Sequence, residues 1–201
     1  MRLRIGEAAP RQQSPVTCGA TVLTVVRALV DPTLARWLAG EDTRPDLPAA
    51  PTPEARLAAY EAIVHGRTTS VRGPGGRLQA PWPRALGTPP WGAQAELESG
   101  AAAAGTRYRV RLLRLAGRRE LGEAVARLTD VVAAGSPAVL YVGSRSMPRH
   151  VALVVPGETG PAVYDPGYGR VQPLRTDELV GHRLDIGGWA VPWFVIEPTG
   201  R

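Results

Sequence analysis

The only cysteine of the chain is the residue best suited to act as a nucleophile. Cys18 follows a short polar turn, residues 11–17, and precedes an apolar run, residues 20–26, that is long enough to form a buried helix. A thiol at a helix N-terminus lies beside unpaired backbone N–H groups and the positive end of the helix dipole, which favour the thiolate. A lone cysteine is also common as a small buried apolar residue. The nucleophile hypothesis therefore requires a base elsewhere in the chain.

A glutamine upstream of the cysteine is spaced to complete an oxyanion hole. Gln12 lies six residues before Cys18 and can fold back to place its amide beside the sulfur. That amide and the backbone N–H of Cys18 would together stabilise the oxyanion of an acyl-transfer intermediate. Gln13 competes for this role, and the spacing favours Gln12.

A histidine and an aspartate in the second half of the chain supply the base and its orienting partner. His150 begins an apolar segment that continues over residues 151–155, and Asp165 ends the next one, residues 162–165. The turn-like linker 157–161 predicts an antiparallel hairpin. The start of its first strand then lies beside the end of its second, so His150 and Asp165 meet. The carboxylate would fix the imidazole, whose other nitrogen would face the thiol.

Each of these residues also has a purely structural interpretation. Asp165 begins an Asp-Pro-Gly turn, in which aspartate commonly caps its own backbone. The remaining histidines fit the base role less well, because His65 is expected at the end of a helix and His182 in a glycine-flanked turn. Metal-ligand spacing is absent from the sequence, which predicts no metal and no cofactor.

The order of the predicted elements favours an α+β fold. Helices are expected at 18–30, 32–38, 52–64, 88–104 and 119–134, and strands at 106–115, 137–142, 150–156, 162–165 and 191–196. Because helices come first and strands cluster at the end, we expect a largely antiparallel sheet. The proline- and glycine-rich stretch 41–87 is predicted to be mostly loop, of the kind that forms lids or binding loops.

Composition is typical of one globular domain over residues 1–201. Hydrophobic residues make up 44% and charged residues 21%. The sequence shows no signal-peptide pattern, no membrane-length apolar stretch and no cysteine pair, so we expect a cytoplasmic protein without a membrane partner. The net charge of +6 comes from scattered arginines, with no lysine and only 5% aromatic residues, which argues against nucleic-acid binding.

Short motifs along the chain resemble the papain-like cysteine peptidases, and among these the C39 and C39-like branch that processes bacteriocins. The similarity extends to about residue 169, with 41–87 as an apparent insertion. The motifs are Gln12, Cys18-Gly19 at a helix start, Thr88-Pro89-Pro90-Trp91 before a helix, Ala134-Gly135-Ser136-Pro137-Ala138-Val139 before a strand, Arg149-His150 before an apolar strand, and Tyr164-Asp165-Pro166.

The resemblance implies a papain-like fold, in which an N-terminal helical part with a central nucleophile helix packs on a mostly antiparallel sheet. It implies Cys18 as nucleophile, His150 as base and acid, Asp165 as the orienting carboxylate and Gln12 as oxyanion donor. We expect hydrolysis of peptide bonds in a peptide or protein substrate. Glutamine deamidation and transglutaminase-like acyl transfer use the same residues and stay open, as does a catalytically silent binding module.

Overall fold

The structure, a computed structural model, describes residues 1–199. Backbone contacts divide the chain into two compact units. The helical unit contains residues 1–2 and 10–106, and the sheet unit contains residues 3–9 and 107–199. That residues 1–201 form a single papain-like domain stays a prediction.

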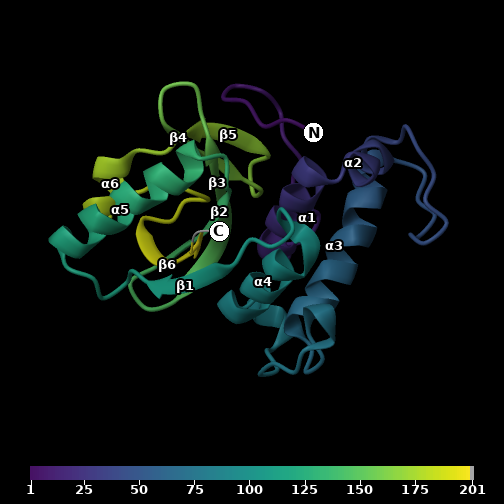
Figure 1. The fold of residues 1–201 in the computed structure, drawn as a ribbon, viewed down its shortest axis with the longest axis horizontal. Coiled ribbons are helices and arrows are strands. Elements are labelled where there is room, and N and C mark those ends of the chain that lie inside the picture. The colour runs from purple at the N-terminus through teal and green to yellow at the C-terminus, as the bar shows by residue number, and fades with distance from the viewer. Residues whose placement is uncertain (200–201) are drawn as a thin grey trace. The chain divides into compact units, whose positions relative to one another are not determined.

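The helical unit is built around a buried first helix (Figure 1). Helix α1 is buried at every residue from Cys18 to Val26, as the apolar run predicts. The elements of this unit are α1 (Cys18–Val30), α2 (Pro32–Ala39), α3 (Pro53–Thr69), the 3₁₀ turns η1 (Pro74–Gly76) and η2 (Arg84–Leu86), α4 (Pro90–Glu96) and the π-helical turn η3 (Leu97–Ala101).

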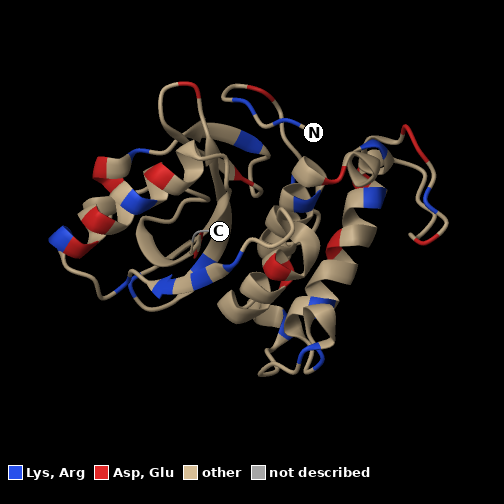
Figure 2. Ribbon diagram, viewed as in Figure 1, with Lys and Arg blue, Asp and Glu red and all other residues tan. Residues whose placement is uncertain are grey.

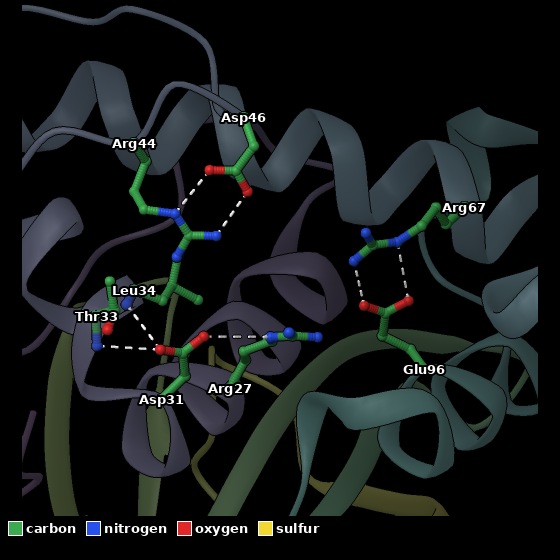
Figure 3. Close-up of polar contacts among 8 residues, drawn as sticks. All are labelled: Arg27, Asp31, Thr33, Leu34, Arg44, Asp46, Arg67 and Glu96. Carbon is green, nitrogen blue, oxygen red and sulfur yellow. Dashed lines mark hydrogen bonds and ion pairs between the residues drawn. The ribbon is translucent and has the colours of Figure 1, made fainter.

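Asp31 separates α1 from α2 and caps the second helix (Figure 3). Its carboxylate accepts the backbone N–H groups of Thr33 and Leu34, both at 3.0 Å. The same carboxylate lies 3.9 Å from the guanidinium of Arg27 in the last turn of α1. Gly40, with φ of +84°, ends α2.

Helix α3 begins where the sequence predicts but ends five residues later than expected. Thr52 caps it by accepting the N–H of Ala55 at 3.2 Å. The helix then continues through His65 to Thr69, so the prediction that His65 lies at a helix end is wrong. The extra turn is buried against the rest of the unit, and this packing overrides the low helix propensity of Gly66.

The shortened fourth helix packs closely on α3. The helix expected to reach residue 104 leaves α-helical geometry after Glu96, and Gly100 has φ of +119°. A Cβ atom at Gly92 would lie 2.3 Å from the backbone oxygen of Thr68, so only glycine permits this approach. An ion pair between Arg67 of α3 and the buried Glu96 of α4 joins the two helices (Figure 3).

The sheet unit contains one six-stranded sheet in the order β1-β6-β2-β3-β4-β5. Every neighbouring pair is antiparallel, which establishes the α+β class. Its elements are β1 (Tyr108–Leu112), α5 (Arg118–Ala133), β2 (Ala138–Gly143), β3 (Pro148–Pro156), β4 (Pro161–Asp165), β5 (Arg170–Pro173), α6 (Thr176–Val180) and β6 (Val191–Pro198). The short strand β5 was not predicted.

The core of the sheet unit lies between α5 and one face of the sheet (Figure 1). The apolar stripe of α5 supplies Leu121, Ala124, Leu128 and Val132. It packs on alternate residues of the central strands: Ala138, Leu140 and Val142 of β2, Ala152 and Val154 of β3, and Val163 of β4.

A segment from the start of the chain covers one edge of the sheet. Ala8 forms a β-bridge with Arg170 of β5. The backbone N–H of Ala9 donates to Gly169 at 2.9 Å, and that of Gly6 donates to Val171 at 3.4 Å. Residues 3–9 therefore shield strand β5, which would otherwise be an open edge.

Charged residues are spread over helices, strands and loops of both units (Figure 2). Both basic and acidic residues lie along α5. Within residues 1–199, no single helix has both the length and the apolar character of a membrane span; α1 and α2 meet that test only as a pair, across a bend of 119°.

Candidate active site

Strand pairing brings His150 and Asp165 together at one end of the sheet. In the β3–β4 hairpin Leu153 lies opposite Tyr164, which sets Ala152 opposite Asp165. His150 precedes Ala152 by two residues and therefore shares the face that carries Asp165. The Nε2 atom of His150 lies 2.8 Å from Oδ1 of Asp165.

Asp165 is fully buried and satisfied on both carboxylate oxygens. Oδ1 also accepts the backbone N–H of Gly167 at 2.9 Å, and Oδ2 accepts that of Gly187 at 2.8 Å. Burial alone would raise the pKa of Asp165, but the hydrogen bond and charge of His150, with the two backbone N–H groups, outweigh it and lower the pKa. An ionised carboxylate only accepts hydrogen bonds, so Nε2 of His150 is the donor. In the neutral imidazole, Nδ1 is then the nitrogen that can accept a proton.

A tight turn of two glycines holds the other side of the imidazole. Gly187 and Gly188 have φ of +61° and +77° and connect Ile186 to Trp189, whose backbones are paired. This is the geometry of a type I′ turn. A Cβ atom at Gly187 would lie 2.6 Å from Cδ2 of His150, so the ring packs directly on the glycine backbone. The sequence analysis did not identify Gly187, although two glycines in tandem are a signal for such a turn.

Cys18 is the first residue of α1 and is buried, with 5% of its surface exposed. Its neighbour Gly19 allows the first turn of the helix to contact the segment before α4. A Cβ atom at Gly19 would lie 2.6 Å from Cβ of Thr88. The glycine that follows the cysteine is thus required by packing, whatever the thiol does.

The two candidate oxyanion glutamines point to different surroundings. Gln12 is half-buried, and its Nε2 donates to the backbone oxygen of Ser14 at 2.8 Å, which leaves a second amide hydrogen on the same nitrogen. Gln13 is exposed, and its Nε2 donates to the backbone oxygen of Arg11 at 2.6 Å. The half-buried Gln12 is the one that the spacing favours.

A buried glutamate that the sequence analysis did not single out anchors this turn. Glu61 of α3 is 1% exposed. Its Oε2 accepts the backbone N–H of Gln13 at 3.2 Å and the hydroxyl of Thr17 at 2.9 Å, and its Oε1 accepts the hydroxyl of Thr21 at 2.7 Å. Burial raises the pKa of Glu61, although these hydrogen bonds oppose the shift. The sequence feature that could have identified Glu61 is its position between Tyr60 and Val64, which places a carboxylate on the apolar face of a predicted helix.

The other two histidines are His65 in the helical unit and His182 in the sheet unit. His65 is buried inside α3, and His182 follows α6 with φ of +54°. Burial, assisted by nearby arginines, lowers the pKa of both imidazoles. Among residues 1–199 the structure gathers no set of three histidine, cysteine, aspartate or glutamate side chains arranged to hold a metal ion.

The structure therefore places the predicted residues as two pairs. Gln12 and Cys18 belong to the helical unit, and His150 and Asp165 belong to the sheet unit. The second pair is joined by a direct hydrogen bond. The first pair lies on one segment, which ends at the N-terminus of α1.

A scan against protein-family models finds no match, and neither does a search of curated proteins. A search of solved structures finds similarity to the crystal structure of the Pseudomonas avirulence protein AvrPphB, with 14% sequence identity over 96% of this chain and 95% of that chain and a TM-score of 0.47. Similarity at this level does not assign the chain to a family, so its function has to rest on the chemistry of its own residues.

Proposed function

We propose that this protein is a papain-like cysteine peptidase of the C39-like type, which hydrolyses peptide bonds in a peptide or protein substrate. The observation that carries the proposal is the His150–Asp165 pair. A buried, ionised carboxylate fixes Nε2 of His150 at 2.8 Å and directs the proton-accepting function to Nδ1. This is the arrangement that a general base for a thiol requires. Cys18, the only cysteine, supplies that thiol from a helix N-terminus.

The proposed mechanism proceeds through an acyl-enzyme. The Cys18 thiolate, paired with the His150 imidazolium, attacks the carbonyl carbon and forms a C–S bond. The backbone N–H of Cys18 and the amide of Gln12 stabilise the oxyanion. The imidazolium gives its proton to the leaving nitrogen as the C–N bond breaks. His150 then removes a proton from water, which attacks the thioester and releases the acid and the thiol.

The identity of the acceptor distinguishes this proposal from its nearest alternatives. The same acyl-enzyme formed on a glutamine side chain would release ammonia, and hydrolysis would complete a deamidation. An amine in place of water would give acyl transfer. Incubation with peptide mixtures, with and without an added primary amine, separates these outcomes by product mass.

The first test is the pH dependence of Cys18 alkylation by iodoacetamide. We expect fast alkylation to persist below about pH 6 in the wild type, because the thiolate–imidazolium pair supplies the nucleophile there. The His150→Ala variant should lose this fast phase. An ordinary thiol has a pKa of about 8.5 and reacts slowly in this range.

Two variants control the measurement. Cys18→Ala removes the only thiol and sets the labelling background. His182→Ala changes a histidine of the same unit outside the pair and should keep the wild-type profile. Slow labelling of the wild type at acid pH, rising only near pH 8.5, would contradict the enzyme proposal and favour a silent binding module.

A further inference from the structure

Among residues 1–199, the buried carboxylate of Glu61 accepts hydrogen bonds from the segment that carries Gln12 and Cys18 and from the first turn of α1. Its two contacts at Oε2 come from Gln13 and Thr17, which are the direct chain neighbours of those two residues. Its contact at Oε1 comes from Thr21, one helical turn further on. One side chain of α3 thus connects both ends of the proposed oxyanion hole to a second helix.

The donors around Glu61 show which of these bonds is hardest to replace. Each threonine hydroxyl has one proton and a second acceptor within reach: Ser14 O at 3.0 Å for Thr17, and Thr17 O at 2.9 Å for Thr21. The backbone N–H of Gln13 has Glu61 as its acceptor. Loss of the carboxylate would leave this N–H without its partner.

A carboxylate at this position is costly for the fold, because burial opposes its charged form. Within residues 1–199 no arginine forms an ion pair with Glu61. An apolar side chain between Tyr60 and Val64 would complete the buried stripe of α3 more cheaply. The presence of a carboxyl group here is explained if its hydrogen bonds fix a backbone geometry that packing alone would not fix.

We propose that Glu61 is a positioning residue, which holds residues 12–18 so that the amide of Gln12 and the backbone N–H of Cys18 converge on one oxyanion. This inference rests on the proposed function. Oxyanion stabilisation depends on donors placed within a few tenths of an ångström, so a loosened segment should impair attack on a carbonyl more than it impairs the thiolate itself.

The experiment compares two reactions of the same thiol. Alkylation by iodoacetamide displaces iodide and forms no oxyanion, whereas acylation by p-nitrophenyl acetate passes through a tetrahedral oxyanion and releases a burst of p-nitrophenolate. The ratio of the two rate constants reports oxyanion stabilisation. General destabilisation lowers the folded fraction in both reactions and leaves their ratio unchanged.

Glu61→Leu removes every acceptor and should lower the acylation-to-alkylation ratio at least about tenfold, since loss of one oxyanion donor costs about 10²–10³. Glu61→Gln keeps an oxygen for Gln13 and Thr17 and can donate to Thr21, so it should recover most of the ratio. Thr21→Val removes only the partner of Oε1 and should stay within about threefold of the wild type.

A wild-type ratio in a folded Glu61→Leu variant would overturn the inference. If that variant does not fold, Glu61→Asp provides the same test, because its carboxylate is withdrawn by one methylene from the N–H of Gln13 and the hydroxyl of Thr17. An unchanged ratio there overturns the inference as well. A wild type that alkylates slowly and gives no burst contradicts the proposed function itself, which is a distinguishable failure.

Discussion

The two units of this protein hold their candidate catalytic residues by different means. In the sheet unit, backbone fixes the pair: strand register places His150 and Asp165 on one face at one end of the hairpin, two backbone N–H groups satisfy the carboxylate, and a glycine turn packs on the ring. In the helical unit, a side chain does this work. Gln12 and Cys18 lie on a turn tied to α3 by the buried carboxylate of Glu61.

This difference determines where each unit is sensitive to substitution. The backbone hydrogen bonds between strands depend little on which side chains the strands carry. The sheet unit should therefore be disturbed mainly by substitutions that place a side chain where there is no space for one. The helical half should instead be disturbed by removing polar partners, because a buried group left without its partner is costly. The predictions below test this contrast.

The largest effect is expected at the glycine beside the imidazole. Gly187→Ala would bring a Cβ atom to 2.6 Å from Cδ2 of His150 at a φ of +61°. The ring must move or the turn must open, and misplacement of a catalytic base by about 1 Å costs roughly 10²-fold. We expect about a 100-fold loss of acylation by p-nitrophenyl acetate.

Gly188→Ala is the matched control for this variant. Gly188 has a similar φ, +77°, and no atom lies within 4 Å of the position of its Cβ. It carries the same backbone penalty of about 1–2 kcal/mol without contact with the ring. Equal losses of activity in the two variants would mean that backbone strain, rather than crowding of His150, is responsible.

The next effect concerns buried charge in the helical unit. Arg67→Met keeps the aliphatic bulk but leaves Glu96, which is 3% exposed, without its ion pair (Figure 3). We expect a loss of about 3 kcal/mol in the free energy of unfolding by urea, the lower end of the range for a broken buried pair because Arg67 is itself partly exposed. Arg44→Met breaks the exposed pair with Asp46 and should leave stability unchanged within error.

The smallest effect is a difference between the two units in how their stability changes in mild acid. Burial raises the pKa of Glu61, against the hydrogen bonds of its partners, and raises that of Glu96 against the charge of Arg67. The native helical unit then binds protons before the unfolded chain does, so its stability should rise as the pH falls from neutral toward about 4.3.

The sheet unit should respond in the opposite sense. The pKa of Asp165 is lowered by its partners despite burial, so the unfolded chain binds the proton first. The stability that Asp165 provides is complete above about pH 3.9 and falls as the pH drops through its native pKa. Amide hydrogen exchange at pH 6, 4.5 and 3, corrected for intrinsic rates, measures the local stability of both units. A parallel loss of protection in the two units would contradict the prediction. The Asp165→Asn variant should no longer lose protection in the sheet unit as the pH falls.

The parts of the structure that sequence analysis predicted depend on local patterns. The apolar run after Cys18 predicts α1, and the linker 157–161 predicts the β3–β4 hairpin with His150 and Asp165 at one end. Period-2 alternation then suffices to place both side chains on one face.

The parts that it did not predict depend on contacts between distant segments. Gly187 contacts His150 from 37 positions further along the chain, and Glu61 bonds to Gln13 across 48. The helix that carries Glu61 also extends past Gly66, because tertiary burial outweighs propensity there. Local sequence patterns likewise do not determine whether Cys18 contacts His150, and that contact stays a prediction.

The covering of strand β5 by residues 3–9 has a consequence for self-association. Of the two outer strands, β1 carries charge at its edge, with Arg109 and Arg111, whereas β5 is closed by Ala8 and Ala9. Charged edges resist pairing with foreign strands, but an uncovered edge invites it. A variant that lacks residues 1–9 would thus expose β5 as a template for intermolecular β-pairing. Its solubility should fall even though its hydrophobic core is unchanged.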